Sequence, residues 1–152
     1  MGLTGGRQIV RELWEAGARH GRPPEPTPEV DPWEDEDLYG PPSELAVVFL
    51  GMPALTVRLF LDGADTVTVE DTVDLEVPRK DTVAVVEALI GGRARMRRRP
   101  APFLTRLVGT FFRAPYLTEL VVRLPDVGRT YTAPVLSSLG TGTWTSRMTW
   151  ES

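Results

Sequence analysis

Apolar and charged positions recur at helical spacing near the start of the chain. Between Thr4 and His20, five positions fall on one face of a helix. These positions are Ile9, Val10, Leu13, Trp14 and Gly17. Thr4 can cap the first turn, and Gly21 with the prolines after it ends the pattern. We therefore expect residues 1–20 to form an amphipathic helix, whose stripe packs either on the chain's own sheet or in a groove of another chain.

A proline-rich segment, residues 21–42, separates this helix from the rest of the chain. Its seven prolines disfavour helices and sheet ladders and favour extended backbone. We expect a tether without regular secondary structure. Its centre is acidic and carries aromatic side chains, namely Trp33, Glu34, Asp35, Glu36, Asp37 and Tyr39.

Residues 43–152 carry the pattern of a folded domain rich in strands. The apolar run Leu45–Leu50 predicts a short buried strand. Alternating residues from Leu55 to Leu61 predict a half-buried strand, and Asp62-Gly63 directly after it is a typical hairpin turn sequence. A returning strand then follows as far as Val69.

A second tight turn is expected at Glu70-Asp71, because a straight strand would point Asp71 into the core without a partner. Alternation then resumes as far as Pro78. Asp81 stands where it could cap a helix, and Gly91-Gly92 provides a left-handed stop. The apolar positions expected inside are Val83, Val86, Leu89 and Ile90.

The last part of the chain alternates in several short segments. Arg93–Arg98 predicts an edge strand, since charged edges resist further pairing. Pro102–Phe112 predicts a short helix. Leu120–Leu124 and Arg129–Val135 predict a hairpin around a turn with proline and glycine. The final strand is expected to place four residues on one face, namely Trp144, Ser146, Met148 and Trp150.

This order of elements predicts an α+β fold. A mostly antiparallel sheet packs with one main helix, and the amphipathic helix is attached through the tether. The three predicted parts are residues 1–20, 21–42 and 43–152.

Charge is segregated along the chain, whose net charge is −4. Residues 21–44 hold eight acidic residues and one arginine, whereas residues 79–113 hold nine basic and two acidic residues. In a strand, alternate residues lie roughly 6.5–7 Å apart on one face. Guanidinium groups at that spacing can bind phosphates or carboxylates. The arginines that would share such a face are Arg93, Arg95, Arg97 and Arg99.

These arginines have three interpretations that the sequence leaves open. They are solvated like any exposed charge, they pair with the acidic tether, or they bind nucleic acid. The acidic net charge and the apolar surroundings of the nearby phenylalanines argue against nucleic acid.

The residue types used in catalysis are few. The chain has no cysteine and one histidine, His20, at the end of the predicted helix, where an imidazolium suits the helix dipole. Glu70, Asp74 and Glu76 are expected on the polar side of a strand, as any half-exposed sheet requires. The glycines of Ser137–Thr143 lack the helix and lysine of a phosphate-binding loop. We expect no catalysis, no metal and no cofactor.

The sequence shows no membrane-spanning run and no apolar signal core, so we expect a cytoplasmic protein. Our interpretation is a non-catalytic protein that binds another protein, of the immunity or inhibitor kind. The binding residues would come from the tether acids and aromatics, from the helix stripe (Ile9, Leu13 and Trp14), and from the arginines. The alternatives are a structural or accessory subunit of a larger assembly, which includes self-association, and nucleic-acid binding through Arg93–Arg99.

Overall fold

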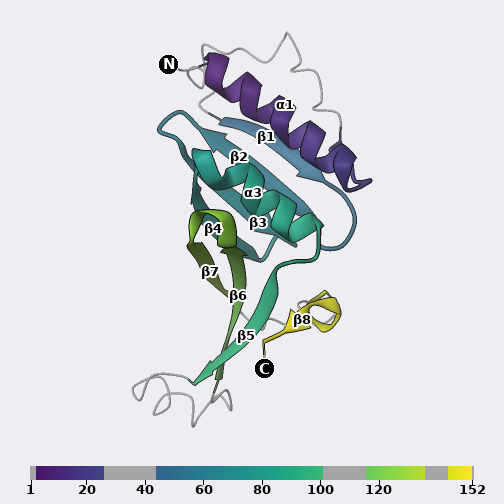
Figure 1. Ribbon diagram of the computed structural model, residues 1–152, viewed down its shortest axis with the longest axis vertical. Helices are drawn as coiled ribbons and strands as arrows, with labels where there is room; N and C mark the ends of the chain where they lie inside the picture. The colour runs from purple at the N-terminus through teal and green to yellow at the C-terminus, as the bar shows by residue number, and fades with distance from the viewer. Residues whose placement is uncertain (1–2, 26–43, 101–115, 136–143, 152) are drawn as a thin grey trace.

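The computed structural model describes residues 3–25, 44–100, 116–135 and 144–151. Over these residues the chain forms two helices and two mostly antiparallel four-stranded sheets, which confirms the α+β class (Figure 1). The predicted short helix at 102–112 and the glycine-containing loop at 137–143 lie outside the described residues. So does most of the predicted tether, of which residues 21–25 are described and have no helix or strand.

The first sheet is an antiparallel meander in the order β1-β2-β3-β4. Its strands are β1 (Glu44–Phe49), β2 (Leu55–Phe60), β3 (Ala64–Val69) and β4 (Val73–Pro78). The prediction of a buried first strand was wrong in one respect, because β1 lies at the edge of the sheet. Val47 and Phe49 point into the core, whereas Ala46 is exposed.

Short turns join β2 to β3 and β3 to β4, as the sequence predicted. Glu70 and Asp71 both have left-handed backbone, with φ of 51° and 54°, and the amide of Thr72 donates to the carbonyl of Val69 across them at 3.1 Å. The turn keeps Asp71 exposed and lets Val69 and Val73 both point inward.

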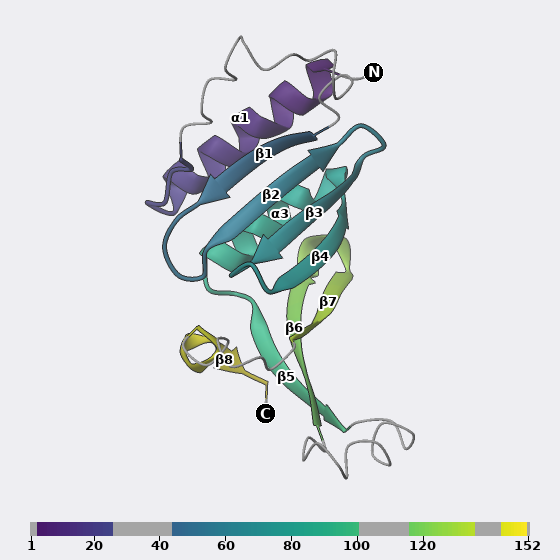
Figure 2. The same cartoon turned by 180° about the vertical axis from the view of Figure 1, so that it is seen from behind.

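Both helices cover the same face of this sheet. They are α1 (Leu3–Arg19) and α3 (Arg79–Ile90). Figure 2, seen from behind, shows the opposite face of the strands with no helix over it. The stripe of α1 packs on the chain's own core: Leu13 and Ala16 are fully buried, and Ile9 contacts the core beside them.

A close approach of backbone fixes the end of α1. The amide of Arg22 donates to the carbonyl of Gly17 at 2.8 Å. A Cβ atom at position 17 would lie 2.5 Å from the Arg22 carbonyl oxygen and 2.9 Å from Phe49. Only glycine fits between the helix, the chain that turns back from it and β1.

The main helix begins three residues earlier than the sequence predicted. Pro78 occupies the N-cap position, and Asp81 lies within the first turn and is buried, so the prediction that Asp81 caps the helix was wrong. Val86 and Leu89 point inward as expected. Val85 and Ala88 complete the buried side, whereas Val83 and Ile90, which were also expected inside, are only partly buried.

The second sheet has the order β7-β6-β5-β8. Its strands are β5 (Arg95–Pro100), β6 (Tyr116–Leu124), β7 (Arg129–Val135) and β8 (Thr149–Trp150). β5 is not simply an edge strand, because β8 pairs with its first two residues in parallel. Both views show β5 and β6 running side by side away from the helices (Figures 1 and 2).

The prediction for the C-terminal strand was wrong. Trp144 is buried, Thr145–Arg147 forms a short 3-10 helix, and only two residues pair as a strand. The alternating sequence therefore does not place Trp144 and Trp150 on one face of a strand.

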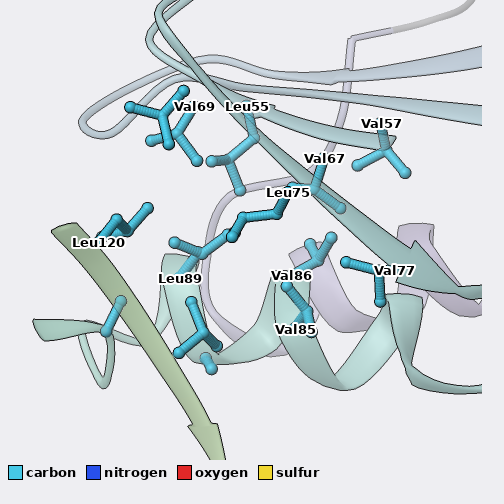
Figure 3. Close-up of a cluster of buried hydrophobic side chains, with 14 of the residues drawn as sticks. Leu55, Val57, Val67, Val69, Leu75, Val77, Val85, Val86, Leu89 and Leu120 are labelled. Carbon is cyan, nitrogen blue, oxygen red and sulfur yellow. The ribbon is translucent and has the colours of Figure 1, made fainter. Parts of the chain in front are cut away.

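One hydrophobic core joins the two sheets through α3. Figure 3 shows Leu89 between the first sheet and Leu120 of β6. The same buried cluster contains Val57, Val67 and Val122. Together with Leu59 and Val86, these residues are at most 3% exposed.

Candidate functional site

The arginine-rich strand forms one side of the second sheet. Arg95, Arg97 and Arg99 alternate along β5 and stand opposite Val121, Glu119 and Leu117 of β6. Residues two apart on a strand share a face, so Arg123 of β6 and Glu151, just after β8, lie on this side as well. We call this surface the arginine face, made of Arg95, Arg97, Arg99, Arg123, Glu119 and Glu151.

Two carboxylates hold most of these guanidinium groups in place. Arg97 Nη2 donates to Glu119 Oε2 at 2.7 Å, and Arg99 Nη1 lies 3.8 Å from Glu119 Oε1. Arg123 Nη2 lies 2.8 Å from Glu151 Oε1. The hydrogen bond that Arg97 donates to Glu119 raises the pKa of Arg97 above its ordinary value. Four guanidinium groups and two carboxylates leave the face with a net charge of +2.

Arg98 points to the other side of β5 and meets the last tryptophan. Its guanidinium carbon lies 4.9 Å from the centre of the Trp150 ring, a cation–π contact. Trp150 remains 40% exposed. An aromatic ring and an arginine are therefore held together at the surface, next to the arginine face.

A shallow open depression of about 350 Å³ lies where these parts meet. Its lining residues are Arg95, Arg123, Trp150 and Glu151. They come from β5, β6 and the C-terminal segment, so the depression exists only because β8 pairs with the start of β5.

The structure places the other predicted binding residues in different surroundings. Arg93 is exposed and precedes β5, so it does not share the strand face with the other three arginines. Leu13 is fully buried, Ile9 packs against the core and Trp14 is half-buried, which puts the helix stripe against its own domain. Trp33, Glu34, Asp35, Glu36, Asp37 and Tyr39 lie outside the described residues.

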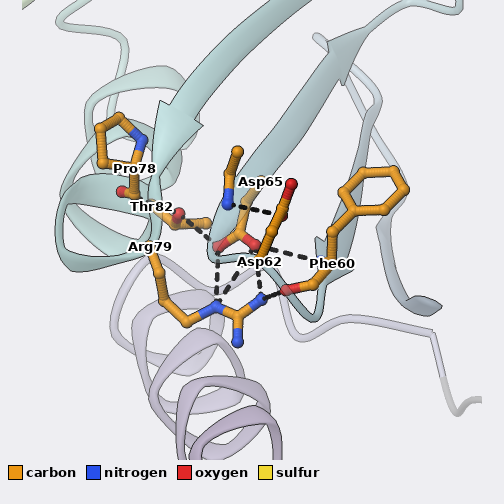
Figure 4. A network of polar contacts seen from close by, with 7 residues as sticks. Phe60, Asp62, Asp65, Pro78, Arg79 and Thr82 are labelled. Atoms are coloured by element: carbon orange, nitrogen blue, oxygen red, sulfur yellow. Dashed lines mark hydrogen bonds and ion pairs between the residues drawn. The ribbon is translucent and has the colours of Figure 1, made fainter. Parts of the chain in front are cut away.

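A second polar cluster is built around Asp65, which is completely buried (Figure 4). Arg79 Nη2 donates to Asp65 Oδ1 at 2.7 Å, and Thr82 Oγ1 donates to Asp65 Oδ2 at 2.8 Å. Arg79 Nη2 also donates to the carbonyl of Phe60. These bonds tie the first turn of α3 to the β2–β3 hairpin, and the bond to Asp65 raises the pKa of Arg79. Every charge is paired within the fold, so the cluster is a structural tie.

A third cluster connects α3 to the second sheet. The hydroxyl of Tyr131 and Nη1 of Arg129 both donate to Asp81 Oδ2. The bond from Tyr131, followed by the contacts with Arg129, lowers the pKa of Asp81. Burial, together with the bond to Asp81, raises the pKa of Tyr131. This cluster also uses its polar groups within the fold.

The residues considered for catalysis are dispersed. Among the described residues, no three side chains of histidine, aspartate or glutamate gather closely enough to hold a metal ion. His20 Nε2 lies 4.0 Å from Glu87 at the surface. Asp74 accepts from Thr68 Oγ1 at 2.7 Å, and Glu70 accepts from the amide of Ala54 at 2.8 Å.

Sequence reasoning missed four residues of the site, namely Glu119, Arg123, Trp150 and Glu151. The alternation in β6 places Glu119 and Arg123 on the side opposite the buried leucines, which was a usable signal. No local signal shows that the C-terminal segment returns to pair with β5.

No family model, curated protein or solved structure matches this chain. In the part of the chain that the structure describes, none of the helices has the length and apolarity needed to cross a bilayer.

Proposed function

We propose that this chain is a non-catalytic protein that binds another protein through the arginine face and Trp150. The observation that carries the proposal is the exposed Trp150 ring with Arg98 stacked on it. Tryptophan and arginine are among the side chains most enriched at the few positions that dominate binding energy in protein interfaces. The surface offers a partner this ring and four further arginines, three of which lie beside carboxylates.

Preorganisation supports the same proposal. Glu119 holds Arg97, and Glu151 lies beside Arg123, so these long side chains are partly ordered before a partner arrives. Ordering a flexible side chain on binding costs roughly 0.5–1.5 kcal/mol. Side chains that are already ordered contribute their contacts at a lower entropic cost.

Within this class we favour a protein that neutralises its partner, as an immunity protein or an inhibitor does, and that acts in the cytoplasm. The support is electrostatic. The acidic stretch Glu34–Asp37 and the net charge of −4 attract a basic partner and speed association. The arginine face then provides contacts of the opposite sign, which fix the orientation of the complex.

The test compares three forms of the full chain as bait in an extract of the native host. They are the wild type, Trp150→Ala, and the control Leu61→Ala, which removes exposed apolar surface from the β2–β3 turn. We expect one protein to be retained by the wild type and the control and lost with Trp150→Ala. Equal retention by all three forms would show that this surface is not the interface.

The retained protein is then purified and measured with the chain. Titration should show that Trp150→Ala weakens binding at least tenfold. Loss of the partner's own activity at one equivalent of chain supports neutralisation. Unchanged or increased activity supports the alternative of an accessory subunit, and retention of the chain itself supports self-association.

A further inference from the structure

We propose that the depression beside β8 binds an extended acidic peptide, whose side-chain carboxylates are held by Arg95 and Arg123. The inference rests on the proposed function, in which this surface contacts another protein. It adds that the segment of the partner bound in the depression is extended and acidic.

Arg95 is fixed in position and keeps unused donors. Its Nη1 donates to the carbonyls of Gly92 at 3.1 Å and Ala94 at 3.3 Å, which hold the guanidinium near the end of α3. Within the described residues, its Nε and Nη2 have no acceptor. These two nitrogens form the edge of a guanidinium that binds a carboxylate through two parallel hydrogen bonds. The geometry therefore leaves a carboxylate-binding edge next to the depression.

Arg123 provides the second positive group. It contacts Glu151 through one nitrogen, Nη2, while its side chain remains 61% exposed. A guanidinium carries five N–H donors, so one carboxylate does not saturate it. Two arginines and one glutamate line the depression and leave it positively charged, which favours an anionic ligand.

The arrangement of charge favours a peptide over a nucleic acid. Glu119 and Glu151 alternate with the arginines across the face. A duplex carries about one phosphate charge per 1.7 Å of axis, so these carboxylates would repel part of any bound backbone. Carboxylates on an extended peptide lie roughly 6.5–7 Å apart on one side and can meet single arginines.

The edge of β5 offers a path for such a peptide. The amide of Glu151 donates to the carbonyl of Met96 at 2.8 Å. Among the described residues, the pairing of β8 with β5 ends at Met96. Because backbone groups alternate along a strand, the N–H and C=O of Arg98 face the same edge. Pro100 has no N–H, so it limits pairing to a short segment. An acidic peptide bound in the depression can therefore extend along this edge of β5 and pair with the backbone of Arg98.

The probe is a labelled synthetic peptide with the sequence of residues 31–39, which is acidic and aromatic. The receptor is the full chain with its own acids neutralised by Glu34→Gln, Asp35→Asn, Glu36→Gln and Asp37→Asn, so that its own segment does not compete. Fluorescence anisotropy measures binding. We expect saturable binding that weakens with added salt, and at least tenfold weaker binding of a peptide with the same four neutral replacements.

Matched arginine variants locate the site. Arg95→Gln with Arg123→Gln, in the same receptor, should weaken binding at least tenfold. The control Arg7→Gln with Arg11→Gln removes two exposed charges from α1 and should change the Kd by less than twofold. Urea unfolding checks that both double variants are folded. If the first pair unfolds the chain, Arg95→Gln alone provides the same comparison.

Three results would overturn this inference: no binding of the acidic peptide, equal weakening by both pairs of substitutions, or tighter binding of a labelled 20-residue oligothymidine. The proposed function is tested separately. If the peptide fails to bind while a host protein is still captured in a Trp150-dependent way, the interface stands and only its preference for acidic peptides is wrong.

Discussion

At the scale of single residues, Asp81 makes the stability of the fold depend on pH. Its pKa is lowered in the folded state by the hydrogen bond from Tyr131 and by Arg129. A carboxylate with a lowered pKa contributes its full stabilisation above the unfolded value of about 3.9. That contribution is lost as the pH falls below this value and through the folded pKa.

We expect Tyr131→Phe to reduce this pH dependence, because the substitution removes the strongest cause of the lowered pKa. Urea unfolding at pH 7, 5 and 3 gives the free energy of unfolding of both forms. The wild type should lose more stability than the variant between pH 5 and pH 3. An equal loss in the two forms would mean that other carboxylates determine the acid response.

Buried charge also shows what the sequence could and could not predict about single residues. Alternation backward from Val69 and Val67 places Asp65 inside, so its burial was readable in the sequence. Its partners Arg79 and Thr82 were not, because they come from the next helix and depend on where that helix begins. Likewise, Asp81 has the residue type of a helix cap, and only the position of Tyr131 explains why it is buried instead.

At the scale of elements, the packing of α3 makes Leu89 the most direct test of the fold. The side chain is 1% exposed and lies between the first sheet and Leu120 (Figure 3). We expect Leu89→Ala to lower the free energy of unfolding by roughly 2–5 kcal/mol through lost burial and the cavity that remains.

Chemical denaturation measures this effect, with Leu61→Ala as the control. Leu61 is 60% exposed, so its replacement should change stability by no more than about 0.5 kcal/mol. A change near zero for Leu89→Ala would place α3 in a different register.

Helices and strands were predictable where one periodic pattern of apolar and polar residues continued over several residues. The strands of the first sheet and the turn at Glu70-Asp71 follow from alternation that one buried face imposes. The C-terminal segment shows the opposite case. Trp144, Met148 and Trp150 occupy alternating positions, yet the chain there forms a 3-10 helix and a two-residue strand, because tertiary contacts decide such short segments.

At the scale of the whole molecule, one core serves both sheets. Buried residues of β2, α3 and β6 belong to the same hydrophobic cluster, and Arg129 of β7 is tied to Asp81 of α3. The sequence predicted the strands but not their division into two sheets, because alternation marks which face is buried and not which strands pair.

We expect this shared core to unfold as one unit. Urea unfolding followed by tryptophan fluorescence, which includes Trp144 near the second sheet, and by far-UV circular dichroism should give coincident transitions. Leu89→Ala should shift both curves by the same amount. Separate midpoints would show that the two sheets unfold independently, in contradiction to a single core.

The close approach at Gly17 restricts how far this sequence can diverge. Any side chain there collides with the backbone at Arg22 and with Phe49, so a descendant that keeps α1 docked keeps glycine at this position. Gly21 is constrained differently: its φ is 66°, but no atom lies within 4 Å of the place of a Cβ, so asparagine can replace it. An invariant glycine followed four residues later by glycine or asparagine is therefore the pattern by which distant relatives of this fold can be recognised.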